Sequence, residues 1–338
     1  IALSPLQDYA AARSYAEQRI ALCRRWQKIY GEAFALTDLV DIAQALGDLN
    51  SARSECQRVL QLAQSVGTRW LQAISARDLG EIHRRLGEYG PAYTLTLQAL
   101  TRFREVGDAI NEVACLTALG RLCTLMGAYD LAHTWFGYFQ QAITTVESLA
   151  GELLDGLLAQ ALLAHYQHNE QQTLQLVDRS WELAQNIGDP LRQAQAQLYR
   201  GHASAGLQQW GAAATAYQLA LALYTEAGKE ACAVEARAGL AALALAQGDP
   251  GLALEQVEAI LPALAANQRV GVDEPLYTCW VCQRVLAANR DPRADAIFEQ
   301  ATALLQHNAA HIDDDAMRHL FIERALTHYD LLRSSLLP

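Results

Sequence analysis

Two cysteines have the spacing of a redox or zinc motif. Cys279 and Cys282 form a C-x-x-C sequence, which supports disulfide exchange beside a strand, or binds zinc when a second cysteine pair completes four ligands. The sequence offers neither a strand pattern nor a second pair at metal spacing. Cys282 also falls on a small-residue position of the repeat described below. We therefore expect both cysteines to be packing residues.

Histidines and aspartates offer further candidates for a metal site. His165 with His168, and His307 with His311, have helical spacings that could place two imidazoles on one face. Neither pair has a third ligand nearby, and the aspartates at 313–315 lack the spacing and glycine of a calcium loop, so we expect them to cap a helix. Phosphate-binding and dinucleotide-binding glycine motifs are absent from the sequence. We predict a non-enzymatic chain that binds no cofactor and no metal.

Composition narrows the possible partners. The chain has 338 residues, of which 51% are apolar, a net charge of -11 and a pI near 5.3. Nucleic-acid binding depends on clustered Lys and Arg, so direct nucleic-acid contact is not expected. The odd number of cysteines, seven, and their scatter within helical segments favour a reducing, cytoplasmic location. Since no apolar run reaches about 18 residues, no membrane span is expected.

The elements that position these residues follow a period of 20 and 40 residues. Glycines recur at 47, 67, 87, 107 and 127, and Leu79-Gly80 returns as Leu119-Gly120. Twenty residues suit one helix of about four turns and a connection with a left-handed residue, so 40 residues make a helix pair. Because strand-like alternation is also missing, we predict an all-α array of helical repeats.

The register predicts how the whole chain is organised. After Gly127, the turn positions continue as His168, Gln208, Gly248 and Asn289. This gives a single array over 1–338, with an orphan helix at 1–31, seven helix pairs at 32–311 and a capping helix at 312–338. The first helix is expected to run to about residue 30 and the next to begin at 37. Because the chain opens on Ile and on half a repeat, we expect it to be part of a longer polypeptide.

Two helix pairs carry the resemblance to a known family. The third pair has Leu116, Leu119-Gly120, Cys123, Ala132 and Phe136 at its pattern positions, and the fifth has Gln197, Arg200-Gly201, Ser204, Ala213 and Tyr217. This pattern resembles the tetratricopeptide repeat (TPR). The resemblance implies a right-handed TPR α-solenoid, a superhelix of antiparallel helix pairs. Small residues would let helices approach closely, and Phe136 and Tyr217 would fill the space between repeats.

The repeat length suggests a particular variant. Its period is about 40 rather than 34 residues, and repeats end in phrases such as Phe-Arg-Glu-Val-Gly-Asp at 103–108. This is similar to the sensor arrays of bacterial STAND signal-transduction ATPases, including activators like the maltose-operon regulator. Similar repeats occur in peptide-pheromone receptors, in kinesin light chains and beside caspase-like CHAT proteases. The resemblance implies a sensor of a small-molecule or peptide inducer that controls an effector part; the alternatives are a constitutive protein-binding scaffold or a protease adaptor.

The resemblance also implies where a ligand or protein partner would bind. In TPR arrays the first helix of each pair lines a concave groove through positions i, i+4 and i+7. On this register the groove is polar and partly cationic in its N-terminal half and small or apolar in its C-terminal half, although the arginines could equally form an ordinary solvated face. We expect the chain itself to be monomeric. The candidate binding residues are Asp41, Gln44, Arg77, Glu81, Arg84, Arg121, Thr124, His165, His202 and Leu245.

Overall fold

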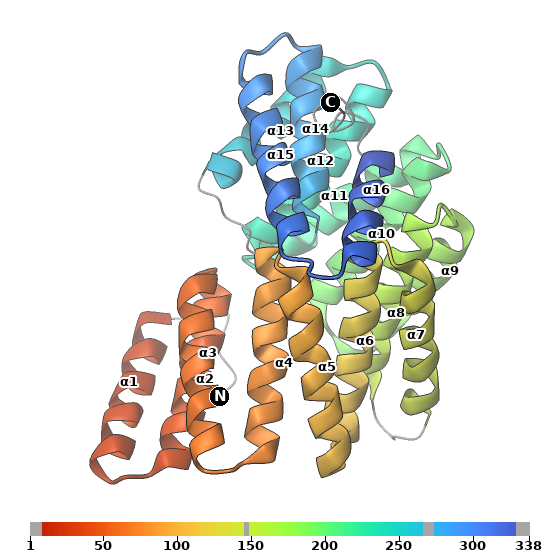
Figure 1. Ribbon diagram of the computed structural model, residues 1–338. Coiled ribbons are helices and arrows are strands. Elements are labelled where there is room, and N and C mark those ends of the chain that lie inside the picture. The colour runs from red at the N-terminus through yellow and green to blue at the C-terminus, as the bar shows by residue number, and fades with distance from the viewer. Residues whose placement is uncertain (1–8, 145–148, 266–273, 329–338) are drawn as a thin grey trace. The chain divides into compact units, whose positions relative to one another are not determined.

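The chain is all-α. The computed structural model describes residues 9–144, 149–265 and 274–328, which form sixteen helices and contain no strand (Figure 1). This confirms the predicted solenoid of antiparallel helix pairs. None of these helices is both long and apolar enough to cross a membrane.

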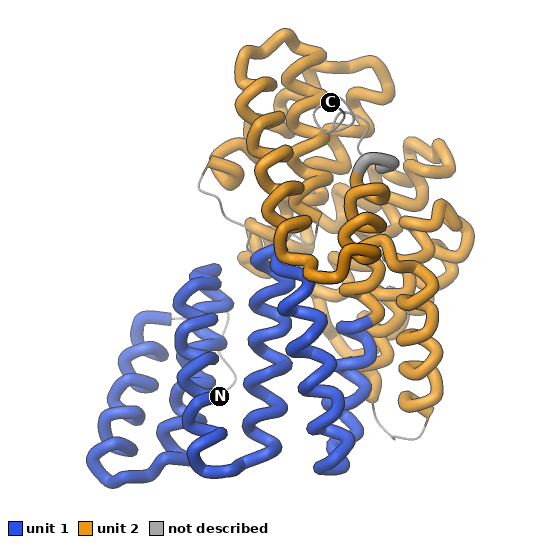
Figure 2. The backbone as a smooth tube through the Cα atoms, viewed as in Figure 1, with its two compact units in different colours: residues 1–119 blue, residues 120–338 orange. Residues whose placement is uncertain are grey.

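The chain divides into two compact units, residues 1–119 and 120–338 (Figure 2), and the boundary falls inside helix α6. Their continuity as a single array stays a prediction. Unit 1 holds α1 (Tyr9–Arg25), α2 (Ile29–Leu46), α3 (Leu49–Ser65), α4 (Arg69–Leu86), α5 (Tyr89–Val106) and the start of α6 (Ala109–Leu125). Unit 2 holds the rest of α6, α7 (Tyr129–Ile143), α8 (Ala150–Tyr166), α9 (Glu170–Ile187), α10 (Pro190–Gly206), α11 (Trp210–Glu226), α12 (Glu230–Ala246), α13 (Pro250–Ala265), α14 (Pro275–Ala288), α15 (Arg293–Ala310) and α16 (Asp315–His328).

Left-handed residues end many of the helices, as the glycine spacing predicts. Gly47 has φ 81° and its N–H donates to the carbonyl of Gln44, 3.2 Å away, which satisfies a free carbonyl of the last turn. His168 and Gln208 take the same conformation, with φ 56° and 58°, although neither is glycine. These turn positions are confirmed. In the last of them, Arg290 rather than Asn289 is the left-handed residue.

The first helix boundary differs from the prediction. α1 ends at Arg25 and α2 begins at Ile29, whereas the sequence suggested one helix to residue 30 and a start at 37. The break is a left-handed turn at Gln27, φ 54°, closed by a bond from the Lys28 N–H to the Cys23 carbonyl. No glycine or proline marks this turn, so it has no local signal in the sequence.

Aromatic side chains in unit 2 pack against glycines, as expected. Phe136 is 4% exposed, and a Cβ on Gly120 would lie 2.6 Å from its ring. Tyr217 is 2% exposed and lies between Gly201 of α10 and Gly239 of α12, where either added Cβ would come within 2.4 Å of the ring. Such contacts admit no larger residue without displacement, so these glycines set the distance between neighbouring helices.

The last helix folds back onto the start of unit 2. Asp314 Oδ1 accepts the Met317 N–H at 2.8 Å, which confirms the expected aspartate cap of α16. A Cβ on Gly127, in the turn between α6 and α7, would lie 2.7 Å from the Leu320 carbonyl oxygen. α16 is therefore packed on this turn by a backbone approach that requires glycine.

Candidate ligand-binding pocket

Unit 2 has a pocket of about 180 Å³ on the first helices of four successive pairs. These helices are α8, α10, α12 and α14, which are labelled in Figure 1. In a TPR array the first helix of each pair is expected to line the binding face. The pocket is rich in aromatic rings and has two carboxylates in its lining. Its lining residues are Leu162, His165, Tyr166, Tyr199, His202, Glu235, Glu274, Tyr277 and Trp280.

Two histidines stack on one side of the pocket. The rings of His165 on α8 and His202 on α10 lie 5.4 Å apart and 20° from parallel. His165 Nδ1 is 3.0 Å from the carboxylate of Glu170, which is buried. Gly206 makes room for that carboxylate, because a Cβ there would meet Glu170 Oε1 at 2.7 Å. The orientation of His165 is thus fixed from behind by the next helix.

His202 is enclosed by rings from three elements. Its Nδ1 is 2.9 Å from the Tyr217 hydroxyl of α11, and its ring meets Tyr277 of α14 edge-on at 5.3 Å. The Tyr217 and Tyr277 hydroxyls also hydrogen-bond each other. Burial, and then the neighbouring His165, lower the pKa of His202 to about 3. His202 is therefore a neutral imidazole at physiological pH.

Two glutamates supply the charge of the pocket. Glu235 on α12 is 4% exposed, and its Oε1 accepts the backbone N–H of Glu274 at 2.5 Å. Glu274, at the N-cap of α14, has its Oε2 3.9 Å from Arg324 Nη1 of α16. The same guanidinium lies over the ring of Tyr166, with Cζ 4.7 Å from the centroid. A cation of the chain itself thus contacts two lining residues.

Trp280 is shared with a second, smaller pocket. It lies 6.0 Å from the Tyr277 ring and also lines a hollow of about 100 Å³ together with Leu245 and Arg284. The Arg284 guanidinium carbon is 4.9 Å from the Trp280 centroid. A cation of the chain therefore lies over an aromatic ring at both ends of the larger pocket, Arg324 over Tyr166 and Arg284 over Trp280.

The structure brings together some of the predicted binding residues of unit 2. His165 and His202 line the larger pocket and Leu245 the smaller one. Thr124 is instead fully buried, and its hydroxyl donates to the Gly120 carbonyl at 2.9 Å, so it faces its own helix. Arg121 is half-buried on α6 and lines neither pocket.

In unit 1 the predicted arginines are engaged with neighbouring side chains. Arg77 donates to Asp78 at 2.7 Å and also bonds Asn111. Arg84 donates to Glu81 through two nitrogens, at 2.8 and 2.7 Å, and its side chain is only 9% exposed. Both side chains are therefore held against neighbouring residues, and the two interpretations of these arginines, a ligand site and a solvated face, stay predictions.

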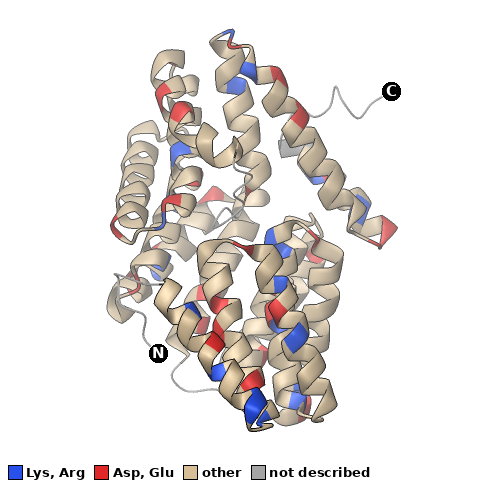
Figure 3. Cartoon of the chain, turned by 90° about the vertical axis from the view of Figure 1, so that its left-hand side faces the viewer, with Lys and Arg blue, Asp and Glu red and all other residues tan. Residues whose placement is uncertain are grey.

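The remaining unit 1 candidates lie on α2. Gln44 Oε1 accepts from Arg85 at 3.4 Å, and Asp41 is exposed. In the view of Figure 3, acidic and basic positions are interspersed on the described helices.

Most of the pocket was not predicted from sequence. The residues missed are Tyr166, Tyr199, Glu235, Glu274, Tyr277 and Trp280. Tyr166 follows the predicted His165 directly, and Tyr199 lies about one turn before the predicted His202, so the helix face that lines the pocket is wider than the one assumed. A search for aromatic and acidic residues clustered around the predicted positions would have found several of them.

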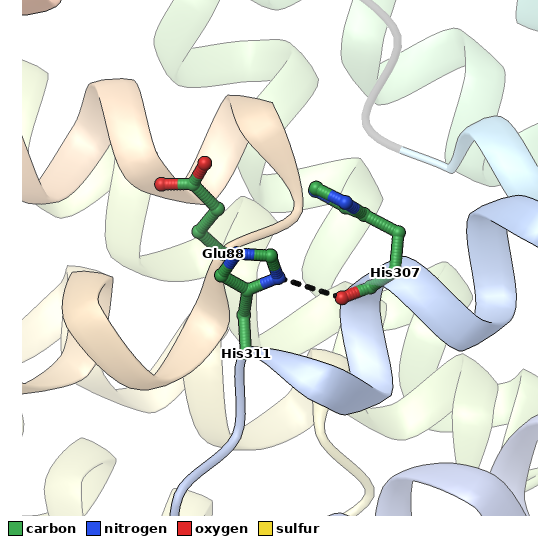
Figure 4. Close-up of side chains that lie close together, drawn as sticks. All are labelled: Glu88, His307 and His311. Atoms are coloured by element: carbon green, nitrogen blue, oxygen red, sulfur yellow. Dashed lines mark hydrogen bonds between the residues drawn. The ribbon is translucent and has the colours of Figure 1, made fainter.

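The cysteines of the C-x-x-C sequence are packed in the interior, and His311 is bonded to its own helix. Cys279 and Cys282 are buried free thiols, and burial raises the pKa of Cys282 above its usual range. Figure 4 shows His307 and His311, in which His311 Nδ1 donates to the His307 carbonyl at 2.8 Å. That ring nitrogen is therefore occupied by the backbone.

Comparisons with known proteins agree with the fold. Residues 31–95 match the tetratricopeptide repeat family, and none of the curated proteins matches in sequence. The crystal structure of a Rap protein complexed with Competence and Sporulation Factor is similar over 97% of this chain and 98% of that chain, with 13% identity and a TM-score of 0.63. BtubC (BKLC) from P. vanneervenii is similar over 65% of this chain and 92% of that one, with 14% identity and a TM-score of 0.52.

A third similar structure is aspartyl phosphate phosphatase F from Bacillus subtilis. It aligns over 98% of this chain and 94% of that one, with 11% identity and a TM-score of 0.52. At such identities the likeness extends to the fold alone. Residues 31–95 therefore match a tetratricopeptide repeat, and the chain shares a helical repeat fold with these proteins.

Proposed function

We propose that this chain is a non-catalytic sensor module that binds a small molecule or a short peptide in the pocket of unit 2. The observation that carries the proposal is the convergence of four first helices, α8, α10, α12 and α14, on one hollow with aromatic walls and few polar groups. Mostly apolar pockets with a few placed polar groups are the usual form of ligand sites.

The fold comparison supports a binding role. One structure with a similar fold is a Rap protein in complex with Competence and Sporulation Factor, so a fold of this kind does accommodate a bound partner. The long repeat, with its resemblance to STAND ATPase sensors, supports the finer proposal that ligand occupancy controls an effector ATPase of the same polypeptide.

A thermal-shift screen of the purified chain tests the sensor function. The screen includes sugars, peptides, amines and anions, and a ligand at 100 times its dissociation constant should stabilise the chain by about 2.7 kcal/mol. Trp280→Leu should abolish the shift. Trp26→Leu, at a residue that is 69% exposed, is the matched control and should retain it. No stabilisation by any class, or an equal shift in Trp280→Leu, would contradict the proposal.

A second candidate function is a protein-binding scaffold, which an aromatic patch in unit 1 favours. Tyr30 and Phe34 stand one turn apart on α2 with 53% and 42% of their surface exposed, and the Phe34 ring lies 6.4 Å from that of Trp70. Exposed aromatic patches often mark protein interfaces. A photo-crosslinker at Trp70 that captures one defined protein irrespective of ligand, and loses it with Phe34→Ser, would favour the scaffold over the sensor.

A further inference from the structure

The charged residues in the lining of the pocket are both acidic, and the nearest basic side chain described above, that of Arg324, lies outside the lining. The lining residues include two carboxylates, Glu235 and Glu274, and no Lys or Arg. His202 adds no positive charge because burial lowers its pKa to about 3. A third carboxylate, that of Glu170, lies directly behind His165. An anionic ligand would meet these carboxylates without a cation in the lining to pair with it.

The aromatic rings of the pocket, like its carboxylates, favour a positively charged ligand. Tyr166, Tyr199, Tyr277 and Trp280 come from three helices and surround the hollow. Ring faces attract cations electrostatically, and the attraction grows when water is excluded. A carboxylate next to several ring faces is a combination that complements an organic cation.

One cation of the chain, the guanidinium of Arg324, already contacts a ring and a carboxylate of the pocket lining. Arg324 of α16 lies over the ring of Tyr166 and within 3.9 Å of Glu274 Oε2, with its side chain 3% exposed. It is held by the same combination of ring and carboxylate that the pocket offers. Arg284 repeats the ring contact on Trp280 at the other end.

Size restricts the ligand further. About 180 Å³ is below the roughly 300 Å³ at which pockets for drug-sized molecules begin. The hollow therefore suits a head group or one side chain, rather than a whole oligosaccharide.

We propose that the pocket recognises a guanidinium or ammonium group, held between the carboxylate of Glu235 and the rings of Tyr277 and Trp280. This inference rests on the proposed sensor function and names the chemical class of its ligand. The group can come from a free small amine or from a basic side chain of a peptide, and paired probes distinguish these sources.

Isothermal titration of the full chain with charged and neutral isosteres tests the proposal. Gly-Arg-Gly is compared with Gly-citrulline-Gly, and ethylguanidinium with ethylurea. In at least one pair the charged member should bind at least about tenfold more tightly than the neutral member. Raising the salt from about 50 to about 500 mM should weaken the binding of the charged member and leave that of the neutral member unchanged. Discrimination in the peptide pair only points to a peptide side chain, whereas discrimination in the small pair also points to a free amine.

Glu235→Gln should remove most of the charge preference. The amide oxygen can still accept the Glu274 N–H, so the fold should be kept, and a melting curve verifies this. Glu230→Gln, an exposed position on the same helix, is the matched control and should leave the preference intact. If Glu235→Gln melts early, the salt dependence of the wild-type chain still decides the question.

Equal affinities within each pair, or no binding of the charged probes at about 10 mM, would overturn the cation proposal. A neutral ligand from the thermal screen whose binding is lost in Trp280→Leu would then leave the sensor function standing. The failure of the two proposals is thereby distinguishable.

Discussion

Acid should destabilise unit 2 through His202. The pKa of this imidazole is lowered to about 3 in the folded chain, chiefly by burial and then by His165, against about 6.5 in an unfolded chain. Between these values the unfolded state binds one proton more than the native state, so stability is full above about pH 6.5 and falls as the pH decreases. Each pH unit costs about 1.4 kcal/mol, and a change from about pH 7 to about pH 5 therefore costs about 2 kcal/mol.

Urea unfolding followed by circular dichroism at about pH 7, 6 and 5 measures this effect. His202→Gln does not titrate, and its amide can still bond the Tyr217 hydroxyl. The stability difference between wild type and variant should change by about 2 kcal/mol over this range, while other titrating groups cancel in the difference. His133→Gln, at an exposed residue, is the control and should show no such change. A wild-type-minus-His202→Gln difference that stays constant with pH would refute the reasoning.

Three further predictions concern packing. Gly239→Ala pushes a methyl group into the Tyr217 ring and should lower the free energy of unfolding in urea by about 1 to 3 kcal/mol. Gly211→Ala, in open space on α11, should raise it by about 0.5 to 1 kcal/mol. Equal effects of the two changes would contradict the glycine contact. Phe136→Ala should cost about 3 to 5 kcal/mol, and an unchanged urea midpoint would mean that the ring does not pack as described. Arg324→Gln removes the cation from the Tyr166 ring and should speed amide hydrogen exchange in α16, while unchanged protection would show that the contact does not hold the helix.

The sequence predicted the repeat better than the pocket. The turn register was readable because left-handed positions favour glycine, and it extended to His168 and Gln208 after a slip of one residue between Gly127 and His168. The turn at Gln27 was missed because nothing in its composition distinguishes it from helix. Local signals therefore located most of the helix ends.

Pocket residues were harder to predict because they depend on the rotation of each helix. His165 and His202 were found from spacing, and they do line one hollow. Glu274 was not predicted because it is the N-cap residue of α14, whereas the groove positions were taken at i, i+4 and i+7 within the helices. Glu235 was not predicted because a glutamate in an alanine-rich helix is ordinarily exposed to solvent, and its burial depends on the packing of the neighbouring helices.

The return of α16 onto Gly127 has a consequence for the order of folding. Helical arrays fold quickly because nearly all their contacts join neighbours in sequence, so little chain entropy is lost before each contact forms. The contact between Leu320 and Gly127 instead closes a loop that contains α7 to α15. It can form only once the intervening helices are in place, so α16 should dock last during folding. On a ribosome, where the chain emerges from its N-terminus, this pocket would acquire its Arg324 neighbour only after the helices that line it have emerged.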